Sequence, residues 1–195
     1  SLNALNSADE LITVQRNNEY SHILPSAQLR YQLGDSTLAR AAWTNAVVRP
    51  TFEEIRPNFT DDGTEAEFGN PDLKALEAQN FDLGIEHYMD SSSLSAYLFY
   101  KEIDNFIYQT DVAGSPAYSA YDEVITFRNG DKANLIGIEL AASHKFESLP
   151  APFNGLLIAA NAAVSESDAE ISSYVDGDIV KRDIQLPNQS DVTGN

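Results

Sequence analysis

The sequence contains no cysteine, and only 12 of its 195 residues are lysine or arginine. The lack of cysteine excludes a disulfide framework and any metal site built from thiolates. The few scattered bases argue against a nucleic-acid partner, because phosphate binding needs clustered lysine and arginine. They argue equally against electrostatic docking on an anionic membrane surface.

Long hydrophobic runs are missing as well. The longest stretch without a charged residue, 148–165, is broken by prolines, a glycine and asparagines, whereas a membrane-spanning helix needs about 20 mostly apolar residues. Residues 1–10 lack the basic start and the apolar stretch of a secretory signal. With 30 acids and a formal charge of -18, these tests alone predict a soluble acidic domain.

The sequence does contain enough apolar material to fold, since 43% of its residues are hydrophobic and 10% are aromatic. Its dominant period is two residues, which is typical of strands with two different faces. This alternation is clearest in residues 27–33, 81–87 and 136–144. Only residues 51–56 suggest a turn or two of helix. The fold class is therefore predicted as all-β.

The pattern predicts an antiparallel up-and-down meander of about six strands, at residues 23–33, 37–45, 79–89, 94–104, 132–146 and 156–164. Short turns alternate with long stretches at residues 46–78, 105–131 and 165–187. Because alternate connections lie at opposite ends of such a sheet, one end carries tight turns and the other carries long loops. Globular domains rarely use structureless loops beyond about 12–15 residues, whereas transmembrane barrels of the bacterial outer membrane have this asymmetry routinely.

The charged residues are distributed unevenly between the predicted strands and the three long stretches. The three long stretches contain eighteen acids and six bases, so they carry -12 of the total charge of -18. The alternation alone leaves two architectures open, because a soluble sandwich and a membrane barrel both need one apolar face. Six strands are too few to close an outer-membrane barrel, which has at least about eight. In the barrel interpretation, the chain is a piece of a larger protein.

Short blocks spread through residues 24–191 carry a further signal. In chain order they are Leu24–Ser26 with Leu29–Tyr31, Leu38–Trp43, Val48–Pro50, Gly69–Leu73, Asn80–Glu86, Phe99–Ile107, Asn129–Asp131 with Gly137–Leu140, and Leu186–Asp191. In this order and spacing they resemble the C-terminal half of the barrel in TonB-dependent outer-membrane receptors. The chain departs from the family at Ala75, where proline is usual, and it shows no plug domain, TonB-binding box or C-terminal strand ending in an aromatic residue.

The resemblance implies that residues 1–195 are a partial barrel, with about six of about 22 strands, in the bacterial outer membrane. The long stretches 46–78, 105–131 and 165–187 would then be extracellular loops. Such receptors are transporters rather than enzymes, and they take up siderophores, cobalamin or oligosaccharides. The implied partners are the TonB complex through the missing plug domain, outer-membrane lipid, lipopolysaccharide and the transported ligand. No cofactor and no metal is implied.

Strand parity assigns side chains to the two faces of such a barrel. The residues expected to face the lumen are Gln28, Arg30, Gln32, Arg40, Asp82, Glu86, Lys101 and Glu139. Hydration or pairing with the plug is a simpler role for them than ligand contact. The residues expected to face lipid are Leu29, Tyr31, Leu33, Phe81, Leu83, Ile85, Ile136, Ile138 and Leu140.

The long stretches also contain aromatic residues that could bind the ligand: Phe52, Phe59, Phe68, Tyr108, Tyr118 and Tyr121. Packing within the loops, or an interfacial belt, is the simpler interpretation of each ring. Acidic runs such as 61–65 could hold Ca²⁺, but they lack the spacing of a calcium loop, which favours solvated turns. Acidic loops could also bridge to lipopolysaccharide phosphates through divalent cations.

Two other functions remain open at this stage. The main alternative is a soluble, secreted β-sandwich that binds glycan or Ca²⁺ through its acidic loops. An acidic β-rich hydrolase is less favoured, because no catalytic motif occurs. The three histidines, His22, His87 and His144, are far apart and lack metal-ligand spacing.

Overall fold

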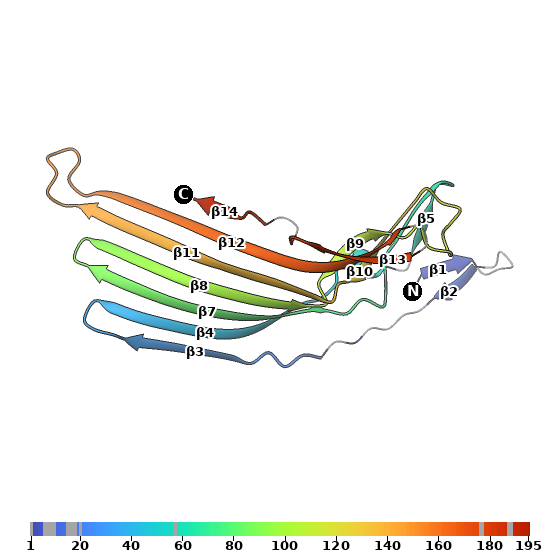
Figure 1. Cartoon of the computed structure of the whole chain (residues 1–195), viewed down its shortest axis with the longest axis horizontal. Helices are drawn as coiled ribbons and strands as arrows, with labels where there is room; N and C mark the ends of the chain where they lie inside the picture. The colour runs from blue at the N-terminus through green and yellow to red at the C-terminus, as the bar shows by residue number, and fades with distance from the viewer. Residues whose placement is uncertain are drawn as a thin grey trace.

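The structure is a computed structural model that describes residues 2–5, 11–14, 19, 21–56, 58–175, 178–186 and 189–195. Its main feature is one long antiparallel sheet, whose tight turns gather at one end and whose long connections gather at the other (Figure 1). Within the described residues, no helix is long and apolar enough to cross a membrane.

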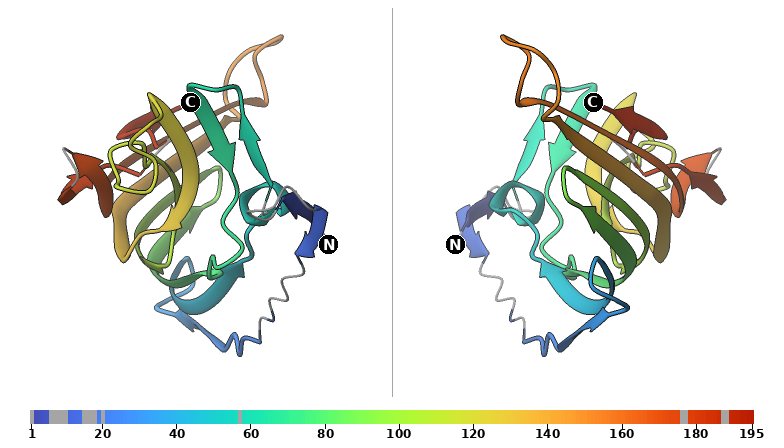
Figure 2. Two further views of the ribbon diagram at one scale, coloured as in Figure 1. Left: turned by 90° about the vertical axis from the view of Figure 1, so that its right-hand side faces the viewer. Right: turned by 90° about the vertical axis from the view of Figure 1, so that its left-hand side faces the viewer.

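Six consecutive long strands, here called the wall, make up most of this sheet. They are β3 (Ser26–Gln32), β4 (Thr37–Val48), β7 (Leu76–Met89), β8 (Ser92–Asp104), β11 (Lys132–Phe146) and β12 (Leu156–Val175). Each pairs with the next in an antiparallel ladder. Seen from its ends in Figure 2, the wall curves into an open arc. The predicted all-β meander is therefore confirmed.

The outer edge of β12 carries two shorter strands, β13 (Asp178–Ile184) and β14 (Val192–Gly194). The sequence predicts a strand ending at residue 164 and a loop at 165–187, whereas β12 continues to Val175. Period two explains the extension: Ser167, Ala169 and Ile171 are buried, while acids occupy alternate positions. Because those acids mask the apolar face, hydrophobicity alone ends the strand too early.

The two earlier long stretches fold together into a second structure, here called the loop module. It comprises α1 (Phe52–Ile55) and a four-stranded sheet of β5 (Phe59–Asp61), β6 (Glu65–Phe68), β10 (Glu123–Asn129) and β9 (Ile107–Asp111). Strands β6 and β10 pair in parallel and so join the stretch 46–78 to the stretch 105–131. A separate antiparallel pair joins β1 (Leu2–Leu5) to β2 (Leu11–Val14).

The predicted helical turn at residues 51–56 is confirmed as α1. A capping box begins it, because Thr51 Oγ1 accepts from the Glu54 N–H (3.3 Å) and Glu54 Oε2 accepts from the Thr51 N–H (2.6 Å). Gly69 packs against this helix so closely that an added Cβ would lie 2.6 Å from the Glu53 carbonyl oxygen. Glycine is therefore required by the close approach of two backbones.

Two of the sequence blocks supply asparagine side chains that bind backbone groups of the loop module and of its junction with the wall. The Asn129 side-chain amide donates to the carbonyls of Lys74 (3.0 Å) and Asn105 (2.8 Å), and its oxygen accepts from the Lys74 N–H (2.8 Å). The Asn70 amide donates to the Phe127 carbonyl (3.0 Å). These asparagines satisfy backbone groups that no strand partner reaches, which gives a physical reason for both blocks.

Most of the buried residues lie at the loop end. One cluster follows a row across four wall strands and is covered by Phe106; its row consists of Ala78, Ile103, Ala133 and Ala169. A second cluster lies inside the loop module and consists of Ala66, Val112, Ala113 and Val124. The loop module thus has a conventional core, whereas most large apolar side chains in the rest of the wall are exposed and Leu38, at 3%, is an exception.

Candidate functional site: the polar face of the wall and its loops

The strand register gives the wall two chemically different faces. One row on the first face is almost wholly apolar and crosses all six strands: Leu29, Ala41, Leu83, Leu98, Ile138 and Val164. Its five large side chains are 43–64% exposed. All nine residues expected to face lipid also have this parity. We call this the apolar face.

The eight residues expected to face the lumen all lie on the opposite, polar face, as the same register shows. Arg30 pairs with Arg40 across β3 and β4, and Arg40 pairs with Gly84 on β7. The loop module covers the loop end of this face through Phe106. The placement on one face follows from the ladder, while lining a lumen stays a prediction.

A β-sandwich would bury the apolar face against a second sheet. In the described part of the chain the second sheet packs at the loop end instead, and on the polar side. The sandwich alternative is therefore wrong about the fold.

A polar cluster on this face centres on Glu86, which is 8% exposed. Glu86 Oε1 accepts from Arg40 Nε (2.7 Å) and from the Tyr97 hydroxyl, and Oε2 accepts from the Tyr88 hydroxyl (2.6 Å). The Tyr97 ring lies over Gly84, where an added Cβ would collide with it. Sequence reasoning names Arg40 and Glu86 but misses both tyrosines; the parity of Tyr88 and Tyr97 was the available signal.

Four of the six loop aromatics form one cluster in the loop module. The ring centroids of Phe68 and Tyr118 are 5.5 Å apart, and Phe59 lies 5.7 Å from Phe68 and 6.1 Å from Tyr121. Phe52 instead lies on α1 and is 74% exposed. The cluster therefore contributes to the core of the loop module, and Phe59 is its most exposed large apolar member at 48%.

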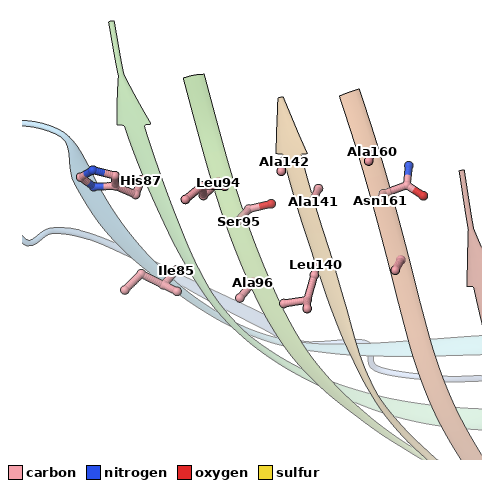
Figure 3. A pocket seen from close by; sticks show the side chains of 11 residues that line it. Ile85, His87, Leu94, Ser95, Ala96, Leu140, Ala141, Ala142, Ala160 and Asn161 are labelled. Carbon is pink, nitrogen blue, oxygen red and sulfur yellow. The ribbon is translucent and has the colours of Figure 1, made fainter. Parts of the chain in front are cut away.

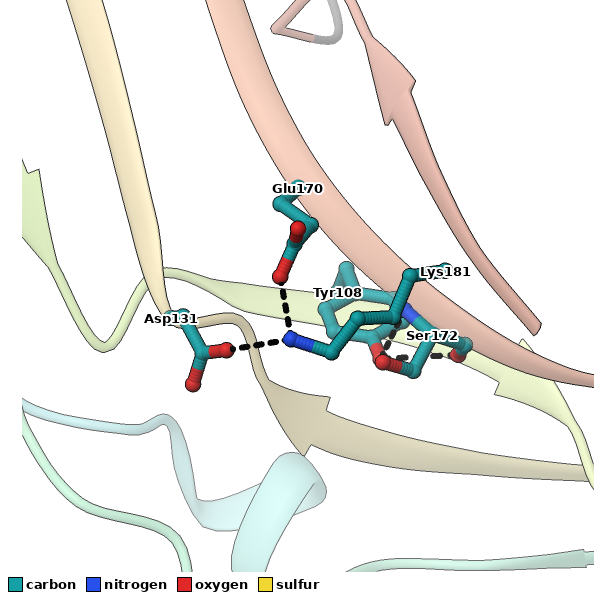
Figure 4. Close-up of polar contacts among 5 residues, drawn as sticks. All are labelled: Tyr108, Asp131, Glu170, Ser172 and Lys181. Carbon is teal, nitrogen blue, oxygen red and sulfur yellow. Dashed lines mark hydrogen bonds and ion pairs between the residues drawn. The ribbon is translucent and has the colours of Figure 1, made fainter. Parts of the chain in front are cut away.

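The sixth aromatic residue, Tyr108, fixes the loop module to β12. Its hydroxyl donates to the Ser172 carbonyl (2.9 Å) and accepts from the Ser172 N–H (3.0 Å), as Figure 4 shows. Strand β11 begins at Lys132, opposite Glu170, so it does not reach this part of β12. One phenolic hydroxyl thus replaces the missing strand partner for both backbone groups.

A lysine joins the same region electrostatically. Lys181 Nζ lies 2.5 Å from Glu170 Oε1 and 3.2 Å from Asp131 Oδ2 (Figure 4). The hydrogen bonds that Lys181 donates, first to Glu170 and then to Asp131, raise the pKa of Lys181, so it stays charged at neutral pH. Lys181 therefore reduces repulsion between two acids at a strongly acidic end of the molecule.

The acidic run at residues 61–65 forms a turn whose carboxylates bind its own backbone. Asp62 Oδ1 accepts from the N–H groups of Thr64 (3.2 Å) and Glu65 (2.9 Å). These hydrogen bonds lower the pKa of Asp62, and the bond from the Glu65 N–H has the larger effect. The neighbouring Asp61 accepts from the Tyr121 hydroxyl (2.8 Å) and thereby raises the pKa of that tyrosine. The described residues contain no cluster of three or more potential metal ligands.

Two of the three histidines each form a hydrogen bond with a hydroxyl group near the tight turns. His87 Nδ1 lies 2.7 Å from Thr37 Oγ1, and His144 Nδ1 lies 2.6 Å from Ser92 Oγ. Each pair joins neighbouring wall strands.

One hollow, of about 540 Å³, lies on the apolar face near the tight turns (Figure 3). The small side chains of Ala96, Ala142 and Ala160 leave this space open beside the larger side chains of Leu94 and Leu140. A second hollow of about 490 Å³ lies in the loop module and includes Phe68 and Tyr118 in its lining. Only the second is lined by residues that sequence reasoning selected as ligand contacts.

An arc of long antiparallel strands, apolar on one face and polar on the other, is typical of part of a transmembrane β-barrel. The fold thus defines the class of protein as a β-barrel. A family model described as "TonB dependent receptor-like, beta-barrel" matches residues 3–195. The chain belongs to this TonB-dependent receptor family, which confirms the resemblance seen in the sequence blocks.

Solved structures show the same fold. The chain resembles the siderophore receptor PirA from Pseudomonas aeruginosa with a TM-score of 0.58 and 20% identity, over 75% of this chain and 30% of that one. It also resembles the ferric enterobactin receptor PfeA from Pseudomonas aeruginosa, solved with enterobactin, with a TM-score of 0.55 and 18% identity, over 83% and 27%. Among curated proteins the comparison finds no match. The chain thus spans less than a third of the receptors it resembles.

Proposed function

We propose that this chain forms part of the barrel wall, with its extracellular loops, of an outer-membrane receptor that takes up a ferric siderophore using the TonB complex. The observation that carries the proposal is the two-faced wall. Its apolar face leaves large side chains 43–64% exposed on five of the six strands, which suits contact with lipid. Its polar face suits contact with water and a plug domain.

The family membership supports active transport, and the names of two similar structures support a siderophore as the ligand. PirA is described as a siderophore receptor and PfeA as a ferric enterobactin receptor. Cobalamin and oligosaccharides are the alternative ligands. The polar-face residues would be hydrated or would pair with a plug. Ligand contact is proposed for the six loop aromatics, which are Phe52, Phe59, Phe68, Tyr108, Tyr118 and Tyr121.

Uptake by cells tests this function. The protein that carries this chain would be expressed whole in a bacterial strain that lacks its own siderophore receptors, with and without an intact TonB complex. We expect uptake of ⁵⁵Fe from at least one ferric siderophore, and loss of that uptake without TonB. Uptake of labelled cobalamin or an oligosaccharide, with no iron uptake from a panel of siderophore classes, would replace the proposed ligand. Iron uptake that persists without TonB would contradict the proposed coupling.

The acidic loop end supports a second interaction, in which divalent cations bridge its carboxylates to lipopolysaccharide phosphates. The three long stretches carry eighteen acids against six bases, so direct contact with phosphate would be repulsive. Chelation of Mg²⁺ and Ca²⁺ should release lipopolysaccharide from the purified protein. Unchanged lipopolysaccharide content after chelation would rule this interaction out.

A further inference from the structure

The hollow on the apolar face near the tight turns has a volume of about 540 Å³ (Figure 3), which falls within the range of small-molecule sites. Four neighbouring wall strands, β7, β8, β11 and β12, supply its lining. Most of this lining is alanine, leucine and isoleucine, while Ser95 and Asn161 have the parity of the polar face. Within the described lining, His87 is therefore the polar side chain that belongs to the apolar face. A ligand that fits here needs an apolar chain with a polar group at one end.

Two exposed histidines lie on the apolar face at this place. His87 lines the hollow, and His144 follows two residues after Ala142, which lines it as well. The Nδ1 atoms of the two rings lie 2.7 Å from Thr37 Oγ1 and 2.6 Å from Ser92 Oγ. When the hydroxyl donates to Nδ1, the neutral ring carries its proton on Nε2. Each imidazole can then donate a hydrogen bond to a group outside the wall.

Each histidine pair also lies beside an aspartate in a tight turn. Asp35 precedes Thr37 by two residues in the turn between β3 and β4, and Asp90 precedes Ser92 by two residues in the turn between β7 and β8. The rim of the hollow thus combines hydrogen-bond donors for an anion with carboxylates for a cation. A phosphate joined to an ammonium group has the complementary charges, whereas a lipid with a net negative charge meets repulsion from the aspartates.

We propose that this hollow and its rim bind one molecule of phosphatidylethanolamine. An acyl chain fills the space beside Leu94 and Leu140, and so continues the lipid contact proposed for the whole apolar face. The phosphate accepts a hydrogen bond from His87 Nε2, with His144 as a second donor, and the ammonium group lies on the side of Asp90. The proposal rests on the proposed function only in placing the apolar face in a membrane.

The test uses the protein that carries this chain, expressed whole, purified in detergent and washed free of lipid. It is titrated with palmitoyl-oleoyl-phosphatidylethanolamine or with the matching phosphatidylglycerol, and native mass spectrometry follows binding. We expect one tightly bound phosphatidylethanolamine and weaker binding of phosphatidylglycerol. His87→Leu should weaken this binding about tenfold, the cost of one hydrogen bond to a charged group. His87→Gln keeps a donor and should retain most of the affinity.

A second pair of variants tests the hollow itself. Ala142→Phe fills it with an apolar ring and should abolish the tight binding, whereas Ala41→Phe lies on the same face outside the lining and should preserve it. If Ala142→Phe does not fold, the two His87 variants decide the question.

Three results would overturn the proposal: equal binding of the two lipids, unchanged affinity in His87→Leu, or a dimer of the protein that Ala142→Phe dissociates. The last result would assign the hollow to a second copy. Tight phosphatidylethanolamine binding in a protein that fails to take up iron would leave this site standing and contradict only the proposed function. Iron uptake by a protein without the tight lipid would contradict only the site.

Discussion

The wall and the loop module are both β-structure, yet they are stabilised in different ways. The wall is held by continuous backbone ladders, and its large apolar side chains stay 43–64% exposed along the row that crosses all six strands. The loop module buries residues such as Val124, at 0% exposed, and ties its short strands together with asparagine and aspartate side chains. The comparison teaches that the loop module buries its apolar side chains in a core of its own, as a water-soluble domain does. The apolar face of the wall has no such cover among the described residues, which suits an apolar medium.

The largest difference should appear when a charge is placed on each face of β7. Leu83→Arg puts a guanidinium on the apolar face, where placing it in lipid costs about 2–4 kcal/mol near the bilayer centre. Asp82→Arg places the same group on the polar face and should cost much less. Denaturant unfolding in lipid vesicles measures both. Equal losses in the two variants would remove the distinction between the faces.

A smaller effect is expected where the loop module joins the wall. Asn129→Ala removes three hydrogen bonds to the backbone of Lys74 and Asn105, so it should destabilise the loop module by about 1–3 kcal/mol. Hydrogen exchange should show faster opening of β9 and β10, with the wall unchanged. Asn58→Ala is the control, because among the described residues the Asn58 side chain bonds to the side chains of Arg56 and Thr60 and to no backbone group. Equal exchange in both variants would contradict the role of Asn129.

The polar cluster on the wall should contribute less still. The Arg40 guanidinium is 45% exposed, so solvent screens its attraction to Glu86. A double-mutant cycle with Arg40→Met and Glu86→Gln should give a coupling energy of about 0.5–1 kcal/mol, measured by unfolding in vesicles. Additive effects of the two substitutions would show that the ion pair adds nothing to the stability of the wall.

The smallest effect concerns pH in the turn at residues 61–65. Folding lowers the pKa of Asp62 through hydrogen bonds from the Glu65 and Thr64 N–H groups. The stabilisation is therefore present above the ordinary pKa of an aspartate and is lost as the pH falls through the lowered value. Carboxyl ¹³C NMR should record this lowered pKa. In Asp62→Asn the pH dependence of the turn amides should vanish, and its persistence would assign the effect to another acid.

The wall could be predicted from sequence because its information is local. Period two in residues 27–33, 81–87 and 136–144 fixes both the strands and the face of each side chain, and the register agrees at every residue assigned by parity except Leu33, which follows the end of β3. The predicted end of β12, at residue 164, is too early because the rest of the strand lies beyond the apolar face. There, acids such as Glu166 and Asp168 interrupt the hydrophobic pattern without interrupting the strand.

The loop module could not be predicted in the same way. Its central contact is the parallel pairing of β6 with β10, where Glu65 lies opposite Glu123. No local pattern predicts a pair of like charges across two segments so distant in the chain. The meeting of Phe59, Phe68, Tyr118 and Tyr121 depends on this pairing, so sequence reasoning could choose the aromatic residues but not their arrangement.

The central claim is that the wall separates lipid from water. Because this chain has no cysteine, single cysteines introduced at residues 80–83 and 85 can each carry a spin label in the protein reconstituted in vesicles. Collision with oxygen, which partitions into lipid, should peak at residues 81, 83 and 85. Collision with a water-soluble nickel reagent should be higher at residues 80 and 82 than at their neighbours. Equal exposure of both sets to the nickel reagent would contradict the account.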